Sequence, residues 1–147
     1  MTKTVFICSE GLWQSGHGLG HPLKPERLER TYHLLTAYAL FDGDRSRLIP
    51  ARMPADEELC LFHTEEYVAA VRALSQGKAD FNPARYNFGP GDNPIFENMF
   101  ETEALKVGAA LVAAELVTCG EVDIAFSFSG GLHHAAPARA SGTCSLG

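Results

Sequence analysis

The amino-acid sequence predicts an α/β domain built on an open parallel sheet with helices on its faces. Short runs rich in β-branched and aromatic residues alternate with longer segments whose apolar residues recur at helical spacing. The run at residues 123–128 carries little charge, as expected of a parallel strand that is covered on both faces. Strand, helix, strand order of this kind is typical of α/β proteins.

The first strand is predicted at residues 4–8, TVFIC, and a glycine-rich loop follows it. A helix is then expected from Pro25 to about residue 41, because proline suits the first helical turn. Its apolar face comprises Leu28, Tyr32, Leu35 and Ala39. A weaker strand is predicted at residues 47–50.

The second half of the chain continues the alternation. A short helix is predicted at residues 57–62, and Thr64 is expected to cap the next one. Residues 77–94 are rich in Gly, Pro and Asn and are predicted to form a loop. A long helix is expected at residues 96–119, with Gly120 at its C-terminal cap and the last predicted strand directly after it.

Composition narrows the classes of function. The chain has 147 residues, enough for one domain or part of one, and a formal net charge of −6. The acidic charge disfavours binding of nucleic acid, which depends on basic contacts to phosphate. No apolar run is long enough for a membrane span, and no secretory signal is recognisable. The four cysteines form no CxxC pair, so we expect a reducing, cytoplasmic compartment and no zinc knuckle.

Two adjacent histidines, His133 and His134, follow the last predicted strand across a Gly-Gly turn. A strand that ends in such a turn and then presents polar side chains fits the ligand-binding edge of an open α/β sheet. Histidine titrates near neutral pH, so this pair could transfer protons or bind a metal. From the residues alone, a surface loop that happens to contain two histidines remains the alternative.

Four stretches stand out in this order: HPLKPERL at residues 21–28, FHTEEYV at 62–68, GPGDNPIFENMFE at 89–101, and GGLHHA followed by RASG and Cys144. Together they resemble the zinc-dependent histone deacetylase family, which includes bacterial acetoin-utilisation and acetylpolyamine relatives. The resemblance covers nearly the whole chain, but only the N-terminal part of the family's catalytic domain. It implies an arginase/deacetylase-like fold whose sheet is incomplete on its C-terminal side.

The resemblance implies a hydrolase that removes an acetyl group from an amine, with zinc polarising the carbonyl and activating water. It assigns the main proton transfer to His134 and electrostatic support to His133. The expected substrate is an acetylated and otherwise cationic molecule, either a protein lysine or a polyamine. The acidic net charge is compatible with such a partner.

Three further residues receive roles from the resemblance. Asp92 corresponds to the aspartate at the rim of the active site, which orients the substrate through its backbone N–H groups. The Gly142 carbonyl would accept the substrate amide N–H, and Arg27 corresponds to an arginine beneath the active-site floor. From the residues alone, Asp92 could equally belong to an ordinary turn, and Arg27 could be a solvated helix residue.

The sequence departs from the family near its end. Thr143 stands where the family commonly has an aromatic, and Ser145, Leu146 and Gly147 replace an Asn-Asp pair and the helix after it. The family's zinc ligands, two aspartates and a histidine, lie beyond the histidine pair, so none is assigned here. We therefore expect zinc in a full-length form and none held tightly by this chain. A frameshift and a cut within a loop both remain open.

Two consequences follow from that departure. The alternative function is a catalytically inactive fragment or binding module that keeps the first half of the fold. Because an incomplete parallel sheet leaves a strand edge and apolar surface uncovered, we also expect this chain to self-associate.

Overall fold

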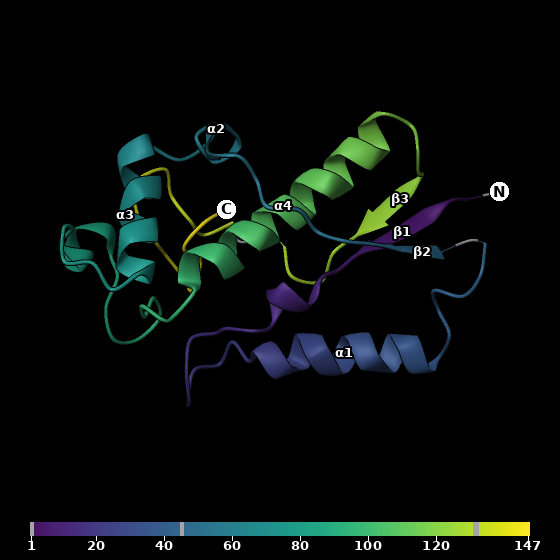
Figure 1. Ribbon diagram of the computed structural model, residues 1–147, viewed down its shortest axis with the longest axis horizontal. Helices are drawn as coiled ribbons and strands as arrows, with labels where there is room; N and C mark the ends of the chain where they lie inside the picture. Colours follow the sequence, from purple (N-terminus) through teal and green to yellow (C-terminus); the bar gives the residue numbers. More distant parts are fainter. Residues whose placement is uncertain (1, 45, 131–132) are drawn as a thin grey trace.

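The computed structural model contains a parallel sheet of three strands, which lies towards the right in Figure 1. The structure describes residues 2–44, 46–130 and 133–147. In the sheet, β1 (Thr4–Ile7) lies between β2 (Ser46–Ile49) and β3 (Ile124–Phe126), and Thr4 is aligned with both Ser46 and Ile124. Parallel neighbours require long crossover connections, and the helices lie within these connections. The predicted open parallel α/β fold is thus confirmed.

Two helices cover opposite faces of the sheet (Figure 1): α1 (Pro25–Ala37) on one side and α4 (Met99–Thr118) on the other. Successive residues of a strand point to opposite faces, so β1 supplies both layers. Val5 and Ile7 pack against α4 in one apolar cluster. Phe6 belongs to a second cluster, which includes partly buried side chains from α1.

Helix α1 ends at Ala37, earlier than the predicted residue 41. The chain leaves the helix because Ala39 adopts a left-handed conformation with φ of 52°. Tyr32 and Leu35 pack partly against the cluster around Phe6, as the predicted apolar face requires, but no residue of α1 is fully buried. Ala39, which was assigned to that face, lies outside the helix and is exposed.

A second part of the core is built by α3 (Glu65–Ser75) and the first half of α4, beside the short helix α2 (Asp56–Leu59). Thr64 caps α3 as predicted, since its side-chain oxygen accepts the Tyr67 N–H at 3.2 Å. The 3₁₀ turns at residues 10–12 and 83–86 complete the regular elements of the described chain. None of the described helices has the length and apolar composition needed to cross a membrane.

The start and the surroundings of α4 differ from the prediction. The helix begins at Met99 and not at residue 96, because Asn98 is left-handed with φ of 57°. The predicted cap is correct, since Gly120 follows the helix with φ of 73°. Within the helix, Glu103 and Lys106 are buried and form an ion pair of 2.6 Å.

Strand β3 is more exposed than its sequence suggests. Within the described residues it pairs with β1 alone, so its other edge is open. Ile124 and Phe126 are 53% and 56% exposed. The expectation of a strand covered on both faces is therefore wrong for the part of the chain that the structure describes.

Candidate functional site

The histidine pair and the residues after it form an irregular segment, 133–147, which we call the histidine segment. It lies against the start of α3 and against the loop that follows α3 (Figure 1). At α3, the Thr64 N–H donates to the Pro137 carbonyl at 2.9 Å. At the loop, the Asn87 amide donates to the Ala140 carbonyl at 2.9 Å. Two separate parts of the fold thus hold this segment by polar contacts.

The end of the histidine segment is packed into the core. Leu146 is fully buried, and the Tyr67 hydroxyl donates to the Ser145 carbonyl at 2.7 Å. The Gly147 N–H donates to Nε2 of His63 at 3.1 Å. Burial lowers the pKa of His63, which favours the neutral imidazole that can accept this hydrogen bond. His63 therefore has a structural role, because it holds the last residue of the histidine segment.

A tight turn lies within the histidine segment. Ser141 and Cys144 exchange two main-chain hydrogen bonds of 2.8 and 3.1 Å, with Gly142 and Thr143 between them. Both intervening residues have positive φ, 52° and 70° respectively. Two-residue turns with positive φ at both central positions strongly favour glycine and asparagine. Glycine suits the first position, whereas threonine, being β-branched, is strained at the second.

Gly142 lies directly against the imidazole of His134. A Cβ atom on Gly142 would be only 2.9 Å from Cγ of His134. The turn and the histidine pair are therefore in van der Waals contact, and only glycine leaves room for the ring. The two histidine rings lie with their centroids 4.2 Å apart, and both side chains are exposed. Residues 131 and 132, which complete the predicted Gly-Gly turn, lie outside the described residues.

Asp92 is exposed in the loop that faces this turn. Its neighbour Asn93 accepts the Thr143 N–H through its side-chain oxygen at 3.1 Å. This contact brings the loop of Asp92 beside the turn of Gly142, although the two lie far apart in the sequence. Three of the predicted site residues, Asp92, Gly142 and His134, therefore belong to one region of the surface.

Arg27 lies in the first turn of α1, where it is exposed. It lines a cavity of about 180 Å³ at the end of β3, together with Gly130 and His17. This cavity is lined by none of Asp92, Gly142 and His134. Two further cations, Lys24 and Lys106, also line this cavity, and none of its described lining residues is a carboxylate. Because Lys106 is paired with the buried Glu103 carboxylate at 2.6 Å, the net positive charge of this lining comes from Lys24 and Arg27.

His17 connects this cavity to the histidine segment. Burial, together with the neighbouring His21 and Lys106, lowers the pKa of His17 to about 4, although a backbone hydrogen bond with Thr143 partly opposes the shift. The ring of His17 stacks on His21 with centroids 4.3 Å apart. Lys106 was not identified as a site residue from the sequence. Glu103 and Lys106 stand three positions apart on a helix, and such charged pairs usually face solvent, so the sequence did not indicate that Lys106 is buried near a site.

The described residues do not fit a catalytic zinc. Such a site needs three protein ligands and one open position. Within residues 2–44, 46–130 and 133–147, no three His, Cys, Asp or Glu side chains converge to hold a metal ion. No step of the chemistry is therefore derived through zinc from these residues.

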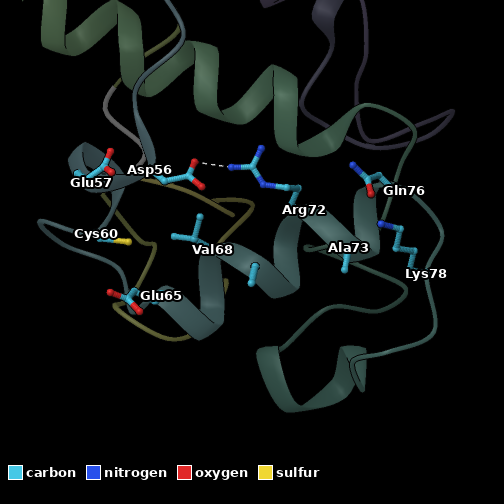
Figure 2. A pocket seen from close by; sticks show the side chains of 10 residues that line it. Asp56, Glu57, Cys60, Glu65, Val68, Arg72, Ala73, Gln76 and Lys78 are labelled. Atoms are coloured by element: carbon cyan, nitrogen blue, oxygen red, sulfur yellow. Dashed lines mark hydrogen bonds and ion pairs between the residues drawn. The ribbon is translucent and has the colours of Figure 1, made fainter.

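A larger cavity, of about 570 Å³, opens on the outer faces of α2 and α3 (Figure 2). Figure 2 shows an ion pair between Arg72 and Asp56 across it, with Val68 on its floor. None of the predicted site residues lines this cavity. The chemistry-bearing residues gather instead around the histidine segment.

Comparison with known proteins identifies the family. The model of the histone deacetylase domain matches residues 21–147. The chain belongs to the histone deacetylase family. The region of the match includes every predicted site residue.

Individual relatives agree with this assignment. The acetoin utilization protein AcuC of Bacillus subtilis is 38% identical over 146 residues, which is 98% of this chain and 37% of that protein. Histone deacetylase RPD3 of Saccharomyces cerevisiae is 31% identical over 146 residues, 98% of this chain and 33% of that protein. The crystal structure of an HDAC homolog from Aquifex aeolicus matches with a TM-score of 0.80 and 30% identity, covering 99% of this chain and 38% of that chain. This chain thus spans little more than a third of the length of these relatives.

Proposed function

We propose that this chain is the N-terminal part of a zinc-dependent deacetylase that hydrolyses an acetylated amine, such as acetyl-lysine or an acetylpolyamine. The observation that carries the proposal is the grouping of Asp92, Gly142 and His134 on one surface, in a chain of the histone deacetylase family. The substrate remains a proposal, because this chain spans only about a third of its relatives.

The proposed roles of the residues are those that the resemblance to the family implies. His134 takes a proton from the attacking water and later gives it to the leaving amine nitrogen, which is general acid–base catalysis. His133, with its ring centroid 4.2 Å from that of His134, supports the developing charge. The Gly142 carbonyl accepts the substrate amide N–H, and the exposed Asp92 carboxylate accepts N–H groups of the substrate backbone at the rim.

Arg27 acts beneath the site in this proposal. Hydrolysis of an acetyl amide releases acetate, a small anion. The cavity of about 180 Å³ is lined by Arg27, Lys24 and Lys106 and would favour a small carboxylate over a cation. In this proposal, the zinc expected of the family is held by residues outside the 147 residues of this chain. The four cysteines are free and accord with the proposed reducing, cytoplasmic location.

The test compares this chain with a longer form extended into the downstream coding sequence. Each protein is incubated with zinc and dialysed, and its metal content and its turnover of a fluorogenic acetyl-lysine and of acetylpolyamines are measured. We expect one equivalent of zinc and steady turnover only in the longer form. There, His134→Ala should lower kcat by about 10²–10⁴-fold, because a proton-transfer group is lost.

The other outcomes are distinct. A longer form that keeps zinc but turns over no acetylated amine would refute the deacetylase proposal and favour the binding module. Retained zinc and steady turnover in the 147-residue chain would refute the placement of the zinc ligands outside it. A kcat near that of the unmodified enzyme in the His134→Ala variant would contradict the role given to this histidine.

A further inference from the structure

Asn93 is the buried residue next to the exposed Asp92. Its side chain is only 8% exposed, although asparagine is usually a surface residue. Buried polar side chains cost free energy unless they are hydrogen-bonded. The partners of Asn93 therefore show what its burial accomplishes.

Two hydrogen bonds fix Asn93. Its main-chain carbonyl accepts the Gly89 N–H at 2.9 Å, which closes the loop that carries Asp92. Its side-chain oxygen accepts the Thr143 N–H at 3.1 Å, across a sequence separation of 50 residues. One side chain thus joins the loop of Asp92 to the turn of the histidine segment.

The residue that donates this hydrogen bond to Asn93, Thr143, has a strained backbone. Thr143 has φ of 70°, and left-handed backbone costs an L-residue about 1–2 kcal/mol. A hydrogen bond to the N–H of that residue helps to hold the turn in this conformation. The residue before it, Gly142, lies so close to His134 that a Cβ atom would overlap the ring. Any shift of the turn therefore changes the position of the imidazole.

We propose that Asn93 is a positioning residue, which holds the Gly142–Thr143 turn and through it His134 at a fixed place relative to Asp92. It contacts neither substrate nor reacting atoms, and it acts through the turn. Its importance for catalysis depends on the proposed function, but the coupling itself is a property of this chain and can be measured without turnover.

The experiment uses NMR of the 147-residue chain. The imidazole Hε1–Cε1 signals are recorded for His134 and for His33, an exposed histidine on α1 that serves as an internal reference. Amide exchange of Thr143 is measured in the same samples. Asn93→Leu keeps the approximate shape and loses the acceptor, whereas Asn93→Asp keeps an acceptor oxygen at the same place. Asn82→Ala is the matched control, because the Asn82 side chain likewise accepts a main-chain N–H, that of Ala84, at 3.1 Å.

We expect Asn93→Leu to shift or broaden the His134 signal and to speed the exchange of the Thr143 amide at least about tenfold, the loss of one hydrogen bond of about 1.4 kcal/mol. The His33 signal should stay in place. Asn93→Asp should restore both readouts, and Asn82→Ala should change neither.

A folded Asn93→Leu chain with unchanged His134 and Thr143 signals would overturn the proposal. If this variant does not fold, the unmodified chain still decides, because its Thr143 amide must be protected from exchange. Exchange of that amide at the rate of an unstructured peptide would overturn the proposal as well. Neither result depends on zinc or on turnover, so failure here is separate from failure of the proposed function.

Discussion

Gly142→Ala tests the contact that joins the turn to the histidine pair. The new methyl group would lie 2.9, 3.0 and 3.1 Å from three atoms of His134, closer than side-chain carbons normally approach. Overpacking of this kind costs about 1–3 kcal/mol. The left-handed φ of 52° adds about 1–2 kcal/mol for an alanine. Together the two costs span about 2–5 kcal/mol; because His134 is exposed and can move partly aside, we expect a loss of about 2–4 kcal/mol.

A second glycine separates the two contributions. Gly77 has φ of 70°, and nothing lies within 4 Å of the position that its Cβ would take. Gly77→Ala therefore measures the backbone cost without the clash. Urea unfolding of both variants gives the comparison, and a loss of about 3 kcal/mol corresponds to a midpoint lower by about 1–3 M for a small domain. The reasoning fails if Gly142→Ala loses no more stability than Gly77→Ala and leaves the His134 NMR signal where it was.

Three other changes test other parts of the fold. Gly108→Ala should destabilise the chain by about 1–3 kcal/mol despite the better helix propensity of alanine, because the new Cβ would be 1.7 Å from the Arg52 carbonyl oxygen. Thermal melting checks this, with Gly43→Ala as the control, because nothing lies within 4 Å of the position of a Cβ on Gly43. The pKa of His17 is about 4 in the folded chain against 6.5 in the unfolded chain, so acid should destabilise the fold. The contribution of His17 to stability is complete above pH 6.5 and is lost towards pH 4, by at most about 1.4 kcal/mol per pH unit. His17→Gln should therefore make the urea midpoint less dependent on pH between about pH 7 and 4, and an equally steep loss of stability in the variant would contradict this. The open edge of β3 should make the chain self-associate, so the mass measured by light scattering should rise with concentration. Ile124→Lys should lower this mass to that of the monomer. A constant monomer mass for the unmodified chain would refute the expected self-association.

The sheet and the helix caps were predictable from the sequence because they depend on local patterns. Strand β1 is an apolar run between polar residues, and it was placed to within one residue. Thr64 and Gly120 cap helices in ways that follow from their own chemistry. The patterns failed where the backbone turns without a glycine or proline. The left-handed conformation of Ala39 ends α1 early, although alanine strongly favours helix and gives no sign of a helix end.

Buried charges were also beyond the sequence analysis. Glu103 and Lys106 form an ion pair of 2.6 Å, which offsets part of the cost of burying two charges on a helix whose other buried residues are mostly apolar. Burial raises the pKa of Glu103, although Lys106 partly opposes this. Buried positions are recognised in a sequence by their apolar residues, because burying an unpaired charge costs free energy. An ion pair offsets this cost, so a buried charged pair is not revealed by the apolar pattern.

Candidate residues of the site were named from the sequence, but the residue that holds them in place was not. The resemblance to the family identified Asp92, Gly142 and the histidine pair, and the structure brings Asp92, Gly142 and His134 to one region. Asn93, which holds two of these parts together, was not foreseen. Its partner is 50 residues away, and a hydrogen bond over that separation leaves no periodic signal in the sequence.

The histidine segment depends on such long-range bonds more than the sheet does. Thr64, Asn87 and Asn93 each hold it through one hydrogen bond, and each such bond contributes about 0.5–1.5 kcal/mol. The apolar clusters on both faces of the sheet involve none of these bonds, so losing one should leave the fold intact. The position of His134 would nevertheless change, because the segment has no regular structure to hold it. Changes at these supports should therefore affect the geometry of the site well before they affect the stability of the domain.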